Sequence, residues 1–316
     1  AKEYFIWFLE QQMISPDTEG MSYDSFSVDN AMVFADAFKR VTGSDELFRR
    51  AYVADFLPKR AIYFYGPNNS GCVNFGDCGR GDYPQPFVTT MKIIAKHTGN
   101  GYAGWYLGAI RPRVPPVSGN EFDIYAVPKP SVTPPSSLPT SKVFQNIGWV
   151  ALRSGWEDDG TLFAFKCSSS QAGHDHWDQN NFVINCAGEW LATDVGYGSF
   201  KSAEDNFYGK HTIGHNTVLI DGEGQKQRAG YIAAFYTAPG YDYTVGDASK
   251  CYGQGKLTKF LRHVVYVKPE YFLILDELQS EGSLCQFEWL LHTDMEGSWS
   301  TDNGKKITVG ENLQAK

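Results

Sequence analysis

The residue pattern of this 316-residue chain changes character at a proline-rich stretch, residues 111–142. Before it, apolar residues recur at helical spacing. After it, short β-branched and aromatic runs alternate with turn residues, a pattern typical of an antiparallel β-sandwich. We therefore predict a multidomain α and β fold: helical hairpins in residues 1–110, an extended connector at 111–142 and an antiparallel β-sandwich in 143–316, with a cleft between the two folded parts.

Three segments of the first part have the spacing of amphipathic helices. Residues 27–43 begin at Ser27, which is expected to cap the helix. Residues 44–60 are expected to end near Pro58, because proline interrupts a helix interior. Residues 82–99 repeat the pattern. Helices separated by short or glycine-rich loops favour an array of helical hairpins.

The second part contains eight runs with the composition of strands. They are expected at residues 146–155, 161–169, 180–188, 189–196, 216–222, 260–269, 270–278 and 285–293. Because turn residues separate these runs at fairly even intervals, an all-β domain accounts for them better than alternating strands and helices do.

Charge and hydropathy exclude two classes of partner. The formal net charge is −8 and the pI is about 5.4, so the chain as a whole has no nucleic-acid footprint. No apolar run reaches the roughly 18–20 residues of a membrane span. Six cysteines form no CxxC pair, and Cys72 and Cys78 would be bridged in an exported protein or remain thiols.

Four of the seven histidines lie within residues 174–215, and three of them accompany Asp194 in a candidate site. His174 and His176 would share one face of a strand. A turn at 187–189 would form a hairpin that returns Asp194 toward His176, and His215 precedes another expected strand. Two imidazoles and a carboxylate suit Zn²⁺. The alternative is that these side chains only hydrogen-bond one another and close the end of the sheet.

Two longer motifs resemble a known family. HDHWDQNNFVINCAGEWLATDVGYG (174–198), followed by HNTVLIDGEGQ (215–225), closely resembles the C-terminal domain of the heparinase II/III-like family of polysaccharide lyases. TEGMSYDSF (18–26) resembles the Glu-Gly-x-Ser-Tyr stretch of the family's α/α toroid. The resemblance covers roughly residues 15–110 and 145–290. It implies a partial α/α toroid followed by an antiparallel β-sandwich, and cleavage of uronic-acid polysaccharides such as heparin, heparan sulfate or alginate by β-elimination.

The resemblance also assigns roles to individual residues. Tyr23 and His174 match the catalytic acid/base pair, and His176, Asp194 and His215 match three positions that bind a structural zinc. A phenol is a usable acid or base if a nearby positive charge lowers its pKa from about 10. We therefore expect the phenol and the imidazole to face each other across one bound uronate ring.

Other residues near the motifs have weaker assignments. Tyr197, Tyr208 and Arg228 are candidates for substrate binding, although the two tyrosines could instead be packing residues. His211 is expected to be an exposed polar side chain. Arg262, inside a strand, is as compatible with a structural ion pair to Asp276 or Glu277 as with a role in binding.

Residues 178–181 are four consecutive polar side chains and are expected to form a turn.

One element of the family pattern is missing. The family has an Asn or His that binds the substrate carboxylate upstream of the tyrosine segment, and this sequence starts after that position. We therefore expect these 316 residues to be part of a longer, periplasmic or secreted protein whose signal peptide lies elsewhere, and to be weakly active or inactive alone. Two alternatives to a lyase are a non-catalytic carbohydrate-binding relative and a uronyl C5-epimerase. In each case the expected partner is an acidic polysaccharide.

Overall fold

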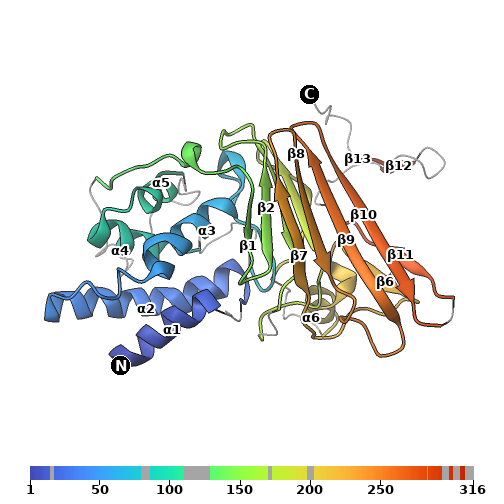
Figure 1. The fold of residues 1–316 in the computed structure, drawn as a ribbon, viewed down its shortest axis with the longest axis horizontal. Helices are drawn as coiled ribbons and strands as arrows, with labels where there is room; N and C mark the ends of the chain where they lie inside the picture. The colour runs from blue at the N-terminus through green and yellow to red at the C-terminus, as the bar shows by residue number, and fades with distance from the viewer. Residues whose placement is uncertain are drawn as a thin grey trace.

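The structure, a computed structural model, places helices at one end of the molecule and two large antiparallel sheets at the other (Figure 1). It describes residues 1–14, 18–79, 86–109, 129–169, 173–197, 203–282, 284–293, 299–301 and 307–309. Residues 82–85 of one expected helix and 111–128 of the expected connector lie outside the described residues. The predicted class, a helical part followed by an antiparallel β-sandwich, is confirmed.

The described residues of the helical part form five α-helices with short π and 3₁₀ segments. They are α1 (Lys2–Ile14), α2 (Gly20–Thr42), η1 (Tyr52–Phe56, a π-helix), α3 (Leu57–Tyr63), η2 (Pro67–Asn69), α4 (Val88–Thr98) and α5 (Gly101–Ala109). Helices α2 and α4 end where expected, because Gly43 and Gly99 adopt left-handed conformations and donate to carbonyls of the last turn. Among the described helices, none combines the length and apolarity needed to cross a membrane.

Two helix boundaries differ from the sequence prediction. Helix α2 begins at Gly20, so Ser27 lies inside the helix and does not cap it. Residues 44–60 do not form one helix: a turn leads into η1, and Pro58 lies in the first turn of α3. Helix α3 continues η1 without a break, so Pro58 lies inside one helical run, directly after its π turn. Pro58 therefore does not end the helix, which continues to Tyr63.

The second part is built from antiparallel strands. A five-stranded sheet contains β1 (Lys142–Phe144), β2 (Trp149–Arg153), β3 (Thr161–Lys166), β4 (Asn181–Cys186) and β5 (Glu189–Ala192) in chain order. A four-stranded sheet has the order β10 (Tyr271–Ser280), β9 (Leu257–Val267), β8 (Tyr241–Asp247) and β7 (Tyr231–Thr237). The remaining elements are η4 (Pro135–Ser137), α6 (Ala203–Lys210), η5 (Thr212–Gly214), β6 (Val218–Ile220), β11 (Phe287–Trp289), β12 (Trp299–Thr301) and β13 (Ile307–Val309).

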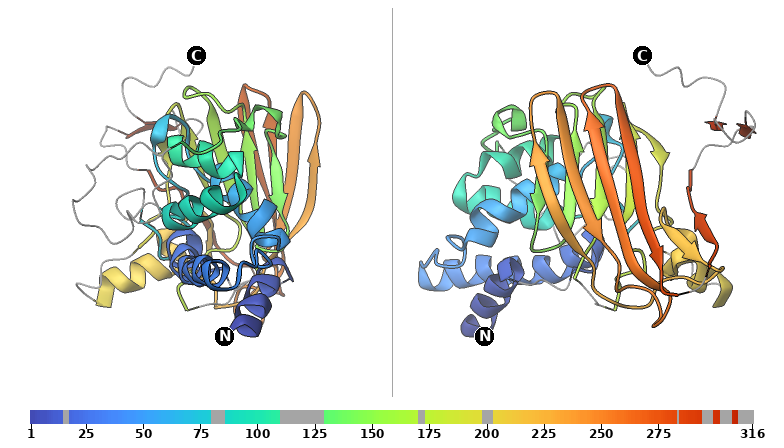
Figure 2. Two further views of the ribbon diagram at one scale, coloured as in Figure 1. Left: turned by 90° about the vertical axis from the view of Figure 1, so that its left-hand side faces the viewer. Right: turned by 45° about the vertical axis from the view of Figure 1, so that its right-hand side comes forward.

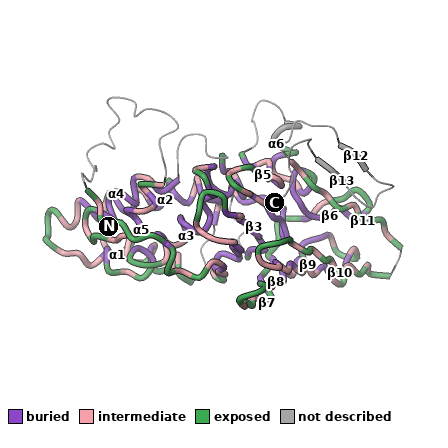
Figure 3. Tube along the Cα trace, turned by 90° about the horizontal axis from the view of Figure 1, so that it is seen from above, coloured by how far each residue is buried: buried purple, intermediate pink, exposed green. Residues whose placement is uncertain are grey.

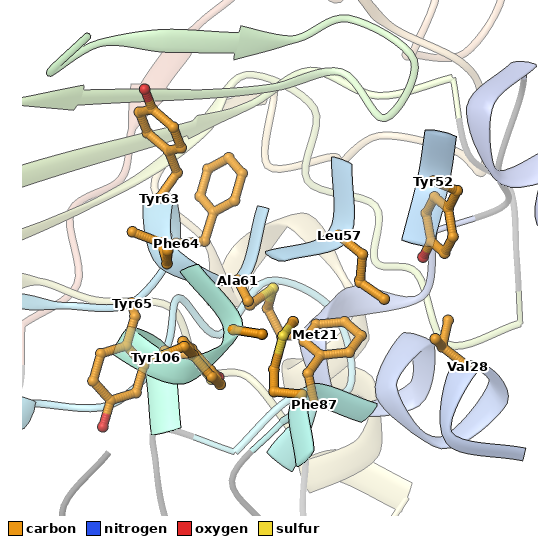
Figure 4. Packing of buried hydrophobic residues seen from close by; sticks show 14 of the residues in the cluster. Met21, Val28, Tyr52, Leu57, Ala61, Tyr63, Phe64, Tyr65, Phe87 and Tyr106 are labelled. Carbon is orange, nitrogen blue, oxygen red and sulfur yellow. The ribbon is translucent and has the colours of Figure 1, made fainter. Parts of the chain in front are cut away.

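The five-stranded sheet lies between the helices and the four-stranded sheet (Figures 2 and 3), and its strands β2 and β3 are buried on both faces. Along β2, Trp149 and Ala151 belong to the core shared with the helices, and Val150 and Leu152 belong to the core shared with the four-stranded sheet. Strand residues alternate between faces, which explains this division. The helical core includes the labelled side chains Met21, Tyr52, Leu57, Phe87 and Tyr106 (Figure 4). The helices and sheets therefore form continuous layers, which fixes α2 relative to the loops of the sandwich.

Arg262 connects three segments of the sandwich that are distant in sequence. Its fully buried guanidinium donates to both oxygens of Asp276, at 2.7 Å each, and to the carbonyls of Asn180 and Asn216 at 2.7 and 2.6 Å. The structural ion pair considered from the sequence is therefore confirmed, with Asp276 as the partner. A buried guanidinium with all of these acceptors fixes the chain on both sides of the histidine cluster.

Candidate functional site

Tyr23 and His174 come from opposite parts of the chain and meet face to face. Tyr23 lies on α2, and His174 lies in the loop before β4; their ring centroids are 3.6 Å apart and the planes are 11° from parallel. The expected juxtaposition of phenol and imidazole is therefore present. A sugar cannot lie between the rings, because they are already in van der Waals contact. A substrate that reaches both must lie along their common edge, which differs from the expected arrangement across the sugar.

Tyr197 is a second aromatic neighbour of Tyr23. The two hydroxyl oxygens are 3.4 Å apart, and the rings are nearly parallel with centroids 6.2 Å apart. The hydrogen bond to Tyr197, partial burial, and the negative charges of Asp77 and Glu19 raise the pKa of Tyr23 to about 12. The charged side chains that shift the pKa of this phenol are therefore the carboxylates of Asp77 and Glu19, and not a cation that would lower it. Tyr23 thus stays protonated at neutral pH and is suited to donate a proton.

His174 and His176 lie in a loop and not in the expected strand, and one carboxylate binds both. Asp77 Oδ2 is 2.7 Å from His174 Nδ1, and Asp77 Oδ1 is 3.0 Å from His176 Nε2. Burial alone would raise the pKa of Asp77, but its bonds to the two imidazoles lower it, so the carboxylate is charged. Asp77 was not anticipated, because its partners are 97 and 99 positions away and NFGDCG has no recognisable ligand spacing.

His176, Asp194 and His215 form a buried cluster whose candidate ligand atoms lie within 4.8 Å of one another. The expected hairpin brings Asp194 into place: Ala187 and Gly188 have φ values of 51° and 93° in the turn between β4 and β5. His215 lies just before β6 and not within it. The three residues matched to a zinc site therefore converge on one point.

Two nitrogen atoms in this cluster have no hydrogen-bond partner, although both are buried. They are His176 Nδ1 and His215 Nε2. The other nitrogen of each ring bonds a carboxylate, since His215 Nδ1 is 2.9 Å from Asp194 Oδ2 and His176 Nε2 bonds Asp77. Burial lowers the pKa of His176, which favours the neutral, ligating form. Hydrogen bonding within the cluster leaves these nitrogens unsatisfied, whereas a cation such as Zn²⁺ would satisfy both.

Residues 178–181 form the expected turn, in which the Asn181 N–H donates to the Asp178 carbonyl at 3.1 Å, and this turn is buried. All four are buried, and Asp178 forms an ion pair with the buried Lys166, which also pairs with Asp175. Asn181 Nδ2 donates to both Asp178 and Asp194. The sequence predicted the turn but not its burial, which is tolerated because the carboxylates have buried partners. Through Asn181, this buried network fixes the position of the Asp194 carboxylate.

Tyr208 and Arg228 have different surroundings. Tyr208 is partly exposed at the end of α6, and its ring centroid is 6.1 Å from that of His292. Burial and the negative charge of Asp194 raise the pKa of Tyr208. Arg228 is exposed and donates to the Lys250 carbonyl at 3.4 Å. Tyr208 therefore lies beside the histidine cluster, and the described contacts of Arg228 do not connect it with the Tyr23–His174 pair.

His211 is not the exposed residue expected from the sequence. It packs between two aromatic rings, Trp177 and Phe207, with centroids 4.0 and 3.9 Å away. Partial burial lowers its pKa, so the ring is a neutral packing element. Its contacts assign it to the support of the loop that carries His176 and not to the ring pair.

Comparison with known proteins gives a family and a set of similar folds. A family model described as "Heparinase II/III-like, C-terminal" matches residues 136–315. No curated protein matches the chain. A crystal structure of heparan sulfate lyase HepC from Pedobacter heparinus aligns with a TM-score of 0.69 and 16% identity, over 94% of this chain and 44% of that one. A crystal structure of Heparinase III aligns with a TM-score of 0.63 and 17% identity, over 86% and 41%. This chain thus spans less than half the length of these two similar proteins.

Proposed function

This chain belongs to the heparinase II/III-like family, and on that premise we propose that it forms part of a polysaccharide lyase. The proposed reaction is β-elimination in a uronic-acid polysaccharide, such as a heparan sulfate-like polymer or alginate. The observation that carries the proposal is the stacked pair of Tyr23 and His174, a proton donor and a proton acceptor 3.6 Å apart between centroids. Polymers of this kind lie outside the cytoplasm, so we place the protein in the periplasm or outside the cell.

His174 is the proposed base. An Nδ1–H donated to Asp77 leaves the lone pair on Nε2, the nitrogen available to a substrate. In β-elimination this lone pair takes the C5 proton of the uronate, the C4–O bond breaks, and a C4–C5 double bond forms. The carbanion character that develops at C5 spreads into the uronate carboxylate, which requires neighbouring donors or positive charge.

Tyr23 is the proposed acid. Its raised pKa, about 12, keeps the hydroxyl protonated until the C4 oxygen needs a proton. Because the two rings are stacked, their polar atoms approach a sugar from the same side. This geometry favours removal of the C5 proton and departure of the C4 oxygen on one face of the ring. Tyr197 and Tyr208, both partly exposed nearby, are the proposed sugar-stacking residues, and Arg228 is retained as a proposed contact for a more distant anionic group.

We further propose that His176, Asp194 and His215 hold a structural Zn²⁺. The cation would neutralise the buried carboxylate and use the two partnerless ring nitrogens. His174 lies two residues from His176, so the ion would fix the loop that carries the base. No step of the elimination requires the metal itself.

A panel of uronate polymers tests the proposed reaction. Full-length protein is incubated with heparin, heparan sulfate, hyaluronan and alginate, and the ultraviolet absorbance of an unsaturated uronate is followed. We expect the absorbance to rise with at least one polymer. Inversion at C5 without a double bond would identify an epimerase, and binding without any product would identify a carbohydrate-binding relative. Either result would overturn the lyase proposal.

Tyr197→Phe is expected to move the alkaline limb of the pH–rate profile to lower pH. A group that acts as an acid must be protonated, so activity persists up to its pKa and falls above it. Because the bond to Tyr197 is the largest cause of the raised pKa of Tyr23, its removal lets the pKa fall from about 12 toward its usual value. The measurement is kcat/KM against pH, with the exposed Tyr236→Phe as control. An unchanged alkaline limb in Tyr197→Phe would contradict the assignment.

A further inference from the structure

Asp77 makes three contacts with the segment that carries both functional histidines. Its carboxylate oxygens bind His174 Nδ1 and His176 Nε2, at 2.7 and 3.0 Å, and its backbone N–H donates to the His174 carbonyl at 3.0 Å. Each oxygen of one carboxylate thus holds a different imidazole. A single rotation of the Asp77 side chain would disturb both rings together.

The loop that carries Asp77 is fixed by the surrounding chain. Asn74 Nδ2 donates to the Asp194 carbonyl at 2.8 Å, and the Cys78 carbonyl accepts from the Tyr197 N–H at 3.2 Å. At Gly76, φ is 70°, and a Cβ atom would lie 2.9 Å from the His174 carbonyl oxygen. A side chain at that position would push the two loops apart, so the close approach depends on glycine. The carboxylate is therefore held by a rigid support.

The two bonds also determine which ring nitrogens remain free. With Nδ1 of His174 engaged, Nε2 is left for the substrate. With Nε2 of His176 engaged, Nδ1 is left, and this is the buried nitrogen of the cluster residue His176 that has no partner. One carboxylate thus sets the tautomer of a substrate-facing ring and that of a metal-facing ring.

We propose that Asp77 is a positioning residue that couples the metal cluster to the base, by orienting His176 toward the cation and His174 toward the sugar. This inference rests on the proposed lyase function and adds a residue that the sequence motifs do not contain. Asp77 touches neither the sugar nor the cation. Its effect passes through the two imidazoles, each of which needs a carboxylate oxygen as acceptor.

Asp77→Asn separates this role from simple packing. The amide has the same shape but only one oxygen, so it can accept from one imidazole N–H and must present N–H₂ to the other ring. One histidine then loses the hydrogen bond that fixes its tautomer. We expect kcat to fall about 10- to 100-fold with KM little changed, and Zn²⁺ affinity to fall by a similar factor. Asp77→Glu keeps both acceptor oxygens, and its kcat and Zn²⁺ affinity are expected to exceed those of Asp77→Asn.

The experiment uses the full-length protein and three readouts. They are kcat and KM on the uronate polymer that is cleaved fastest, Zn²⁺ affinity by competition with a chelator, and the imidazole nitrogen shifts of His174 and His176 by NMR. The matched control is Asp55→Asn, the same substitution at an exposed residue whose ion pair in the described part of the chain is with Lys59. It is expected to leave all three readouts unchanged. If either kcat or Zn²⁺ affinity in Asp77→Asn equals that of the wild type, the coupling is refuted.

Failure of the proposed function is distinguishable from failure of this inference. If the wild-type protein forms no unsaturated product, the lyase proposal fails, and so does the claim that Asp77 orients a base for it. The Zn²⁺ affinity and the nitrogen shifts still report on the orientation of His176 in that case. If the wild type is active and Asp77→Asn retains its turnover, only the role of Asp77 is refuted.

Discussion

Tyr23→Phe in the full-length protein is expected to lower kcat on a uronate polymer by about 10²- to 10⁴-fold, the usual contribution of one acid–base group. Phenylalanine keeps the stack on His174, so the ring geometry and the fold are retained. Only the hydroxyl that protonates the departing C4 oxygen is lost. KM is expected to change little, because a ground-state sugar contact is not the main role of this hydroxyl.

The matched control for this prediction is Tyr4→Phe, which removes a phenol hydroxyl from an exposed position on α1. Initial rates are taken from the ultraviolet absorbance of the unsaturated product, and thermal unfolding of each variant is recorded. A Tyr23→Phe enzyme with wild-type kcat would remove Tyr23 from the chemistry. A lower Tm accompanying a low kcat would instead point to lost structure. We do not expect that result, because Tyr23 is only partly buried.

The sequence predicted those parts of the fold that depend on local patterns. Runs such as 260–269 and 270–278 became β9 and β10, because β-branched and aromatic residues bounded by turn residues favour strands. Strands β7 and β8 were missed. Both contain aromatic and β-branched residues, but two alanines interrupt the run in β7, and Asp242 and Gly246 interrupt the run in β8. Strand β7 also lies at a sheet edge, where few of its residues are buried, so pairing with neighbours contributes strongly to forming such strands.

The candidate site divides in the same way. His174, His176, Asp194 and His215 were predictable, because motif and hairpin turn lie within one continuous stretch of about forty residues that resembles a known family. Asp77 was not predictable from a single sequence, since the contact comes from a loop of the helical part and is fixed by packing between layers. The raised pKa of Tyr23 was also unpredictable, because it depends on the neighbouring Tyr197 hydroxyl.

The second large effect concerns the metal. Removal of Zn²⁺ with a chelator is expected to lower Tm by on the order of 10 °C, because an ion that binds only the folded state at a thousandfold excess over Kd stabilises it by about 4 kcal/mol. Here the ion would also satisfy His176 Nδ1 and His215 Nε2, which are otherwise buried without partners. Readdition of Zn²⁺ is expected to restore Tm. Metal content per chain, measured by mass spectrometry, should approach one.

Substitution then decides whether this cluster holds the ion. His176→Ala is expected to abolish the difference in Tm between protein with and without Zn²⁺, since two remaining ligands bind the ion weakly. His263→Ala, which removes a histidine bonded to Tyr243 on the four-stranded sheet, is expected to keep that difference whatever its own Tm. This comparison cancels the intrinsic cost of losing an imidazole. Equal Zn²⁺-dependent shifts in both variants would place the metal elsewhere, and the two partnerless ring nitrogens of the cluster would then need another ligand.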